Sequence, residues 1–320
     1  MQWVAFSRGL RAEGKLEPRY YRYAGLRIVS EIPVLEWAPF EQEAPNGDQD
    51  VTISLREIPD YEISLAAVPI VTDSDCQFSV PGVGSFRISH GREIVVTVNP
   101  GAPLRELRQW LIGSAWGSLC YQRGLFLMHS SAVMVGEQAV LFCASAKGGK
   151  STLAARLNAR GYPLISDDLC HLDIPEVGTP YVYPSAPRIK LWADTLSELE
   201  PRPMCIEKDP ARAGKFHLAQ IANTQAKAAP IRAIYLLEWG EFGISRLSGL
   251  TALRRLLPAS TYRPRLLGSA QQLSGYCSQS LSVLQRVPLW ELSRPHDPGA
   301  MGSTMDALAS HWANHRMIKT

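Results

Sequence analysis

One segment of the sequence has the residue types and spacing of a phosphate-binding loop. The apolar run Val140–Phe142 leads into Ala144-Ser-Ala-Lys-Gly-Gly-Lys-Ser151, which fits the pattern GxxxxGK[ST] with alanine in place of the first glycine. Small residues let successive backbone N–H groups face an anion, and the start of a following helix adds partial positive charge. A structural glycine turn is the alternative. We expect this segment to bind a nucleotide through Ala144, Ser145, Ala146, Lys147, Gly148, Gly149, Lys150, Ser151 and Thr152.

Two adjacent aspartates follow the loop along the chain. Asp167 and Asp168 come directly after the apolar run Pro163–Ile165. A carboxylate at the carboxyl end of a strand beside a phosphate loop is placed to hold Mg²⁺ or to accept a proton from an attacking hydroxyl. The alternative is that Ser-Asp-Asp only forms a turn. His129, at the end of the apolar run 125–128, is by itself more typical of a structural histidine.

Basic residues that could contact phosphate or substrate lie further along the chain. Arg188 and Lys190 flank an apolar run of strand character, and residues 208–215 are expected to form a loop rich in cations. Such a loop could close over a triphosphate or meet an acidic peptide, whereas solvated surface is the alternative. We take Arg188, Lys190 and Lys215 as candidate substrate or phosphate ligands. The later arginines are expected on the exposed face of a helix and its turn: Arg254, Arg255, Arg263 and Arg265.

Composition excludes several classes of protein. With 320 residues, 46% hydrophobic and 20% charged, the chain is predicted to fold, with two domains. A formal net charge of +3 is too small to indicate nucleic-acid binding. No apolar run is long enough for a membrane span, and charges interrupt the first residues, so we expect neither a membrane protein nor an exported one. Six cysteines without a CxxC pair predict reduced thiols in a cytoplasmic protein.

The elements that must position these residues change in type along the chain. Apolar or alternating runs at 26–29, 51–55, 84–88 and 94–98 predict strands. Helical spacing from Leu107 to Cys120 predicts a helix that ends at Gly124, with Trp110 and Trp116 in a core or interface. Strands are then expected at 125–128, 131–134, 139–142, 163–165 and 231–237, and helices at 151–160, 247–257 and, on the surface, 305–316. The pattern predicts an α/β fold with a β-rich N-terminal domain, 1–124, that ends in a connecting helix, and a catalytic domain, 125–320.

Three segments taken together resemble the catalytic domain of HPr kinase/phosphorylase. They are His129-Ser-Ser-Ala-Val, Ala144-Ser-Ala-Lys-Gly-Gly-Lys-Ser and Gly161-Tyr-Pro-Leu-Ile-Ser-Asp-Asp168, and the resemblance covers residues 125–200. It implies a P-loop kinase fold of the HPr kinase and phosphoenolpyruvate carboxykinase type. It also implies that Lys150 and Ser151 hold phosphates and Mg²⁺. By the same resemblance Asp167 is the base that activates a serine hydroxyl, and Asp168 and His129 support metal and base.

A second segment departs from that family. Pro184–Trp192 contains Arg188 and Lys190 where HPr kinases have a glutamate-containing signature. Together with Tyr23–Pro33 it instead resembles the HPr-kinase-related serine kinases found with lasso-peptide and other modified-peptide gene clusters. That resemblance implies a cytoplasmic kinase that uses ATP and Mg²⁺ to phosphorylate a serine of a precursor peptide. A small hydroxyl metabolite as acceptor, a nucleotide-binding regulator without catalysis, and a homo-oligomer all stay open.

Overall fold

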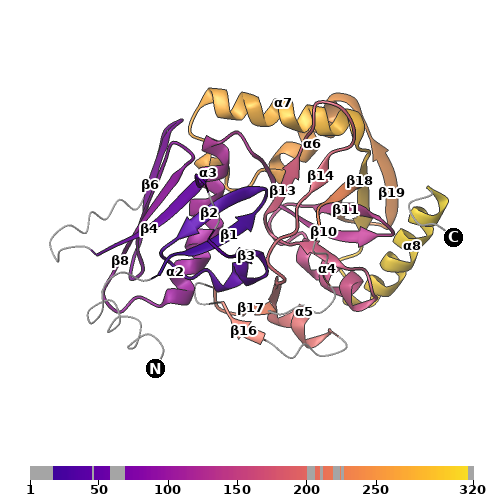
Figure 1. The fold of residues 1–320 in the computed structure, drawn as a ribbon. Coiled ribbons are helices and arrows are strands. Elements are labelled where there is room, and N and C mark those ends of the chain that lie inside the picture. The colour runs from indigo at the N-terminus through magenta and orange to yellow at the C-terminus, as the bar shows by residue number, and fades with distance from the viewer. Residues whose placement is uncertain are drawn as a thin grey trace. The chain divides into compact units, whose positions relative to one another are not determined.

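The computed structural model describes residues 17–44, 47–57, 69–199, 206–209, 212–218, 224 and 227–315. These residues form a mixed α/β fold, as the alternation of strands and helices in the sequence predicts (Figure 1). Contacts divide the chain into two units: Met1–Leu125 with Arg263–Ser274, and Phe126–Tyr262 with Gly275–Thr320. The first unit thus includes a later segment of the chain, 263–274, that no sequence pattern indicates.

The first unit is built on one sheet with strand order β3-β1-β2-β4-β8-β7-β6-β5. Its strands are β1 (Arg19–Tyr23), β2 (Leu26–Ser30), β3 (Glu41–Gln42), β4 (Val51–Glu57), β5 (Ile70–Val71), β6 (Asp75–Val80), β7 (Gly84–Ser89) and β8 (Glu93–Val98), and a 3-10 helix spans Leu35–Phe40. Alternate residues of β8, such as Ile94 and Val96, are buried. The runs expected at β2, β4, β7 and β8 are confirmed as strands, whereas β1, β3, β5 and β6 are additions.

A continuous helical segment packs on this sheet. It consists of α2 (Leu104–Trp110), a π-helical turn (Leu111–Ala115) and α3 (Trp116–Gln122), followed by Gly124 with φ of 67° (Figure 1). Trp116 is fully buried, and its ring lies 5.0 Å from that of Trp37 and 5.6 Å from that of Tyr23. The predicted helix and the core position of Trp116 are therefore confirmed.

The second unit is built on a mixed sheet whose main path is β12-β10-β11-β18-β14-β13-β9, with β20 beside β18 and β19 beside β20. Its strands are β9 (Phe126–Met128), β10 (Ser130–Val135), β11 (Gln138–Cys143), β12 (Leu164–Ser166), β13 (Cys170–Asp173), β14 (Tyr181–Val182), β18 (Ala229–Trp239), β19 (Gly243–Leu247) and β20 (Leu289–Arg294). Strands β11, β18 and β20 are parallel to one another. Their carboxyl ends therefore meet at one edge of the sheet, where β11 leads into the loop 144–151.

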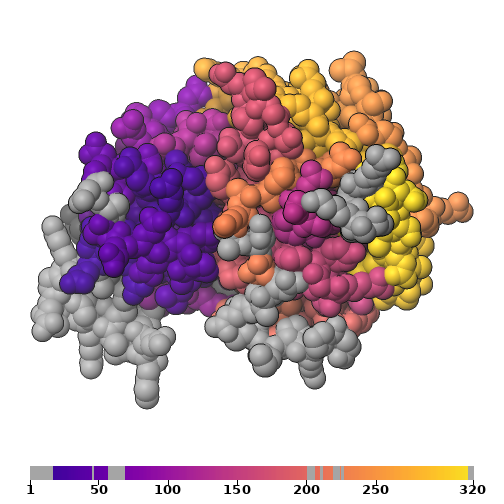
Figure 2. Space-filling model, turned by 45° about the vertical axis from the view of Figure 1, so that its right-hand side comes forward, coloured from indigo at the N-terminus to yellow at the C-terminus, as the bar shows by residue number. Residues whose placement is uncertain are grey.

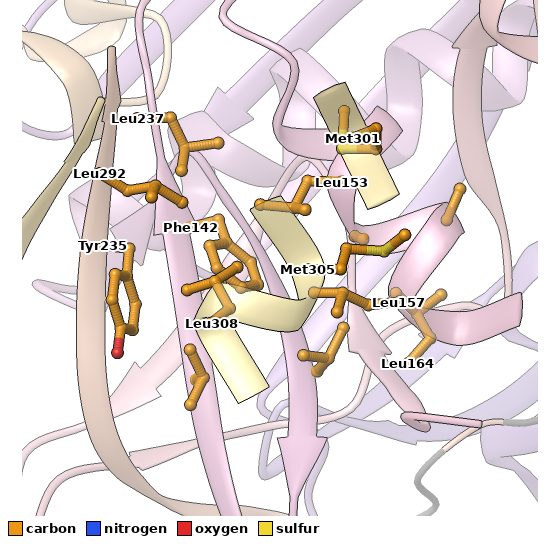
Figure 3. Packing of buried hydrophobic residues seen from close by; sticks show 14 of the residues in the cluster. Phe142, Leu153, Leu157, Leu164, Tyr235, Leu237, Leu292, Met301, Met305 and Leu308 are labelled. Carbon is orange, nitrogen blue, oxygen red and sulfur yellow. The ribbon is translucent and has the colours of Figure 1, made fainter. Parts of the chain in front are cut away.

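Two helices complete the core of this unit. Leu153 and Leu157 of α4 (Lys150–Ala159) and Met305 and Leu308 of α8 (Met301–Asn314) point toward Phe142 of β11 (Figure 3). In Figure 2, α8 forms part of the outer surface, in yellow. It is thus a surface helix as expected, but it begins four residues before the predicted start of 305 and buries one side in the core.

The remaining elements include the helix expected at 247–257, which the structure places at Gly249–Ser260, together with several that the sequence did not predict. They are α5 (Ala193–Ser197), α6 (Gly249–Ser260), α7 (Ala270–Arg286), the 3-10 turns Pro264–Leu266 and Pro298–Ala300, and the small sheet β15 (Ile189–Trp192), β17 (Lys215–Leu218) and β16 (Ile206–Lys208) in the order β15-β17-β16. The expectation that residues 208–215 form only a loop is wrong at both ends. Lys208 pairs with Phe216, and Lys215 pairs with Trp192, so both cations lie on strands.

The cysteines of the described residues are free thiols. Cys76, Cys120, Cys143 and Cys170 are buried and Cys277 is half-buried, whereas Cys205 lies outside the described residues. Burial raises the pKa of the Cys170 thiol to about 12, so this thiol stays protonated at neutral pH. Among the helices that the structure describes, none has both the length and the apolar character needed to cross a membrane.

A buried histidine predicts how stability changes with pH. His171 on β13 is 4% exposed, and burial lowers its pKa from 6.5 to about 3. Below pH 6.5 the His171 imidazole binds a proton in the unfolded chain but not in the folded chain. The stability linked to His171 is therefore complete above pH 6.5 and is lost as the pH falls toward 3. We expect His171→Leu to reduce the slope of unfolding free energy against pH between 6 and 4 by about 1.4 kcal/mol per pH unit. Urea unfolding at stepped pH measures this, and equal slopes in both proteins would contradict it.

Candidate active site

The loop 144–151 contains two residues in the left-handed backbone region, one of them a glycine. Lys147 and Gly149 adopt positive φ values of 64° and 74°, and Lys150 then begins α4. The Lys150 side chain is 8% exposed, and its Nζ donates a hydrogen bond to the carbonyl oxygen of Ala144 at 3.1 Å. Burial lowers the pKa of Lys150, and Asp167 and Asp168 act against this shift. The lysine is therefore held at the mouth of the loop beside the acidic pair.

Alanine at the first position of the loop is explained by the glycine at the fifth. Ala144 has no positive φ, so its methyl group causes no backbone strain. A Cβ atom on Gly148 would lie 2.5 Å from the Cβ of Ala144 and 3.0 Å from the carbonyl oxygen of Ser145. The loop thus has room for one methyl group at this point, and Ala144 supplies it.

This packing makes a paired prediction. We expect Gly148→Ala to weaken Mg·ATP binding about tenfold or more, because the two Cβ atoms cannot both fit without moving the loop. Adding Ala144→Gly to that variant removes the first Cβ and should restore at least half of the lost binding free energy. Isothermal titration of the two variants measures both effects. Equal losses in the single and the double variant would show that contact with Ala144 is not the cause.

Asp167 accepts hydrogen bonds from the loop helix and from β10. Its Oδ1 accepts from the Ser151 hydroxyl at 2.8 Å and from the Ser131 hydroxyl at 2.6 Å, and its Oδ2 accepts from the backbone N–H of Lys190 at 3.2 Å. The sequence predicts Ser151 and Asp168 as joint metal ligands. In the structure, the Ser151 hydroxyl donates its hydrogen bond to Asp167 instead. Ser131 is an addition to the site, and its signal in the sequence is its place two residues after His129.

Asp168 instead faces the ammonium group of Lys190 and the imidazole ring of His129. It adopts a φ of 74°, its Oδ2 accepts from Lys190 Nζ at 2.7 Å, and its Oδ1 lies 3.5 Å from His129 Nε2. Burial alone would raise the pKa of the Asp168 carboxyl, but Lys190 and His129 outweigh it and hold this pKa well below its usual range. Asp168 is therefore a fixed negative charge and a weak base. His129 is oriented by a hydrogen bond from its backbone N–H to the carbonyl oxygen of Ser260 at 2.7 Å.

Two lysines lie close to the ring of an exposed tryptophan near the acidic pair. Trp192 is 36% exposed, and the Nζ atoms of Lys147 and Lys215 lie 5.8 and 5.5 Å from its ring centre. Burial lowers the pKa of Lys215, whereas Asp167 and Asp168 act to raise it, so Lys215 belongs to the same charged group. Arg188, the third cation expected here, is half-buried and adds its positive charge near His217.

The donor set of the site fits a hard cation. Ser151 Oγ and Asp167 Oδ1 are 2.8 Å apart, and Asp168 adds a second carboxylate. Mg²⁺ is commonly bound by one or two such protein oxygens together with substrate phosphates. Within the described residues no group of three or more histidine, cysteine or acidic side chains could hold a metal ion by itself. The oxygens present therefore suit a metal that arrives with a nucleotide.

The chain was compared with protein families, curated proteins and solved structures. The sequence matches no protein-family model and no curated protein. Among solved structures, the chain is similar to the HPr(Ser) kinase/phosphatase from Coxiella burnetii, with 13% identity and a TM-score of 0.33 over 59% of this chain and 98% of that one.

Proposed function

We propose that this protein is a Mg·ATP-dependent kinase that phosphorylates a serine hydroxyl of a peptide. The observation that carries the proposal is the convergence of Lys150 and Ser151 with the carboxylates of Asp167 and Asp168. A glycine-rich loop at the start of a helix, a lysine, a hydroxyl and an acidic pair are the parts that phosphoryl transfer needs. In a structural turn, a buried lysine beside two carboxylates would have no such use.

The reaction assigns one task to each group. Backbone N–H groups of the loop and Lys150 would bind the phosphates and stabilise the charge that develops on them. The acceptor oxygen forms a bond to the γ-phosphorus, the bond from that phosphorus to the bridging oxygen breaks, ADP leaves, and Asp167 takes the hydroxyl proton. Mg²⁺, held by Ser151 and Asp168, would neutralise phosphate charge. Because Lys190 and His129 hold Asp168 in place, we assign the role of base to Asp167.

The surface beside the acidic pair favours a peptide over a free amino acid. Trp192, with Lys147 and Lys215 on its ring, offers exposed aromatic and cationic contact close to the site but away from the reacting atoms. A peptide can use such contacts to position its serine, and free serine is too small to reach them. We include a precursor peptide of the lasso type among these acceptors, and Lys190 and Lys215 as candidate ligands for acidic groups on it.

Intact-mass analysis of acceptors after incubation with Mg·ATP tests the proposal. Serine peptides of differing charge and free serine are compared side by side, with the native protein, Lys150→Ala and Asp167→Asn. The proposal expects peptides to gain phosphate with the native protein and with neither variant. Phosphate on free serine alone would make the acceptor a small molecule. Tight binding of ATP without transfer to any acceptor would indicate a nucleotide-binding regulator.

A further inference from the structure

A buried arginine lies against the phosphate loop. Arg294, the last residue of β20, is 1% exposed, and its Nη2 donates a hydrogen bond to the carbonyl oxygen of Gly148 at 2.8 Å. Its guanidinium stacks on the ring of Trp239, 3.9 Å from the ring centre. Its Nε and Nη1 are buried and have no hydrogen-bond partner among the residues that the structure describes. The side chain thus touches the loop through one nitrogen and leaves two others unsatisfied.

The positive charge of Arg294 is also uncompensated. No carboxylate of the residues that the structure describes forms an ion pair with it, and burial alone lowers its pKa to about 10, so it stays charged at neutral pH. Buried charges in proteins are normally paired, because an unpaired one costs several kcal/mol. The protein without ligand therefore carries an electrostatic penalty next to the place where an anion is expected.

The strand order of the sheet places the Arg294 charge next to the loop 144–151. Trp239 and Arg294 are neighbours at the carboxyl ends of the parallel strands β18 and β20, and β11 on the other side of β18 leads into the loop. A Cβ atom on Gly149 would lie 2.4 Å from Arg294 Nη2 and 3.4 Å from the Trp239 ring. The absence of a side chain at Gly149 is what lets the arginine and the tryptophan press against the loop backbone.

We propose that Arg294 is a positioning residue of the nucleotide site, a buried cation whose charge is balanced by the phosphates of a bound nucleoside di- or triphosphate. It acts through the loop, because its hydrogen bond fixes the Gly148 carbonyl while the loop N–H groups face the phosphates. The inference rests on the proposed function in that the loop binds a nucleotide. It predicts that Arg294 destabilises the unliganded protein and stabilises the liganded one.

Two substitutions separate charge from hydrogen bonding. Arg294→Gln keeps a donor and removes the charge, whereas Arg294→Lys keeps the charge and removes the planar fork. By isothermal titration we expect Arg294→Gln to bind Mg·ATP and Mg·ADP about tenfold or more weakly and adenosine unchanged, and Arg294→Lys to stay within about threefold of the native protein for all three. Without ligand, the melting temperature of Arg294→Gln should equal or exceed the native value, because a buried unpaired charge has been removed.

A second arginine stacked on a tryptophan gives the matched control. Arg246 on β19 lies 5.2 Å from the ring centre of Trp290 and is exposed, so Arg246→Gln should leave nucleotide binding unchanged. If Arg294→Gln binds Mg·ATP as tightly as the native protein, the inference is wrong and the proposed function stands. The same holds if the ligand-free melting temperature of Arg294→Gln falls and its affinities for adenosine and Mg·ATP fall equally. If the native protein binds neither Mg·ATP nor Mg·ADP, the proposed function fails and the inference fails with it.

Discussion

Asp167→Asn is expected to lower the rate of phosphoryl transfer about 10²- to 10⁴-fold, because an amide cannot take the proton of the acceptor hydroxyl. The affinity for ATP should stay within a few-fold of the native value, since Lys150 and the loop are unchanged. The amide oxygen can still accept from Ser151 and Ser131, as the carboxylate Oδ1 does now. Initial rates by intact mass, with ATP affinity measured in parallel, give the two quantities separately.

Ser131→Ala provides the comparison for this prediction. It removes one hydrogen bond to Asp167 and leaves the carboxylate, so we expect a loss of rate below about tenfold. If Asp167→Asn retains more than a tenth of the native rate, Asp167 is not the base and only holds the two serine hydroxyls. A thermal melt of each variant checks that the backbone N–H of Lys190, which lies 3.2 Å from Oδ2, tolerates the amide nitrogen.

Trp312→Ala is expected to lower the free energy of unfolding by about 3–5 kcal/mol. Trp312 on α8 is fully buried, its Nε1 donates to the hydroxyl of Tyr235 at 3.1 Å, and its ring meets that of Tyr162 edge-on at 5.2 Å. Alanine would leave a large cavity between α8 and the sheet and leave the Tyr235 hydroxyl without this donor. Urea unfolding measures the loss as a shift of the midpoint.

Two further variants divide the effect of Trp312. Trp312→Phe keeps most of the ring and removes the hydrogen bond, so it should cost less, about 1–2 kcal/mol. Leu250→Ala, at a position on α6 that is 75% exposed, should stay within about 0.5 kcal/mol of the native protein. A loss of unfolding free energy below about 1 kcal/mol for Trp312→Ala would show that α8 contributes little to the core of the second unit.

The parts of the site that are contiguous in the sequence could be predicted from it. The run from Val140 to Thr152 contains its own strand, turn and helix start, so local rules place it correctly on β11 and α4. The division of roles in the acidic pair is different, because it depends on which way each side chain leaves the chain. The positive φ of Asp168 turns its carboxylate toward Lys190 and His129, and no local pattern shows that.

Elements stabilised by contacts between residues far apart in the chain could not be predicted from the sequence. Helix α7 is rich in serine and contains Gly275, and both are poor helix signals. Tyr276, Ser280 and Val283 recur at helical spacing and are buried. The contact of Arg294 with the loop joins residues 146 positions apart. In the sequence, Arg294 only marks the end of an apolar strand. The order of the strands in the sheet is what brings it to the loop.

The return of residues 263–274 to the first unit has a consequence for how the chain is made. Gly268 approaches the carbonyl oxygen of Thr72 so closely that a Cβ atom on it would lie 2.6 Å away, and the Gln272 side chain donates to the carbonyl oxygen of Asp73 at 3.0 Å. During synthesis these partners leave the ribosome long after the sheet they complete. The N-terminal unit must therefore wait, partly uncovered, until most of the second unit has also been translated. Premature termination anywhere before residue 263 would damage both units at once.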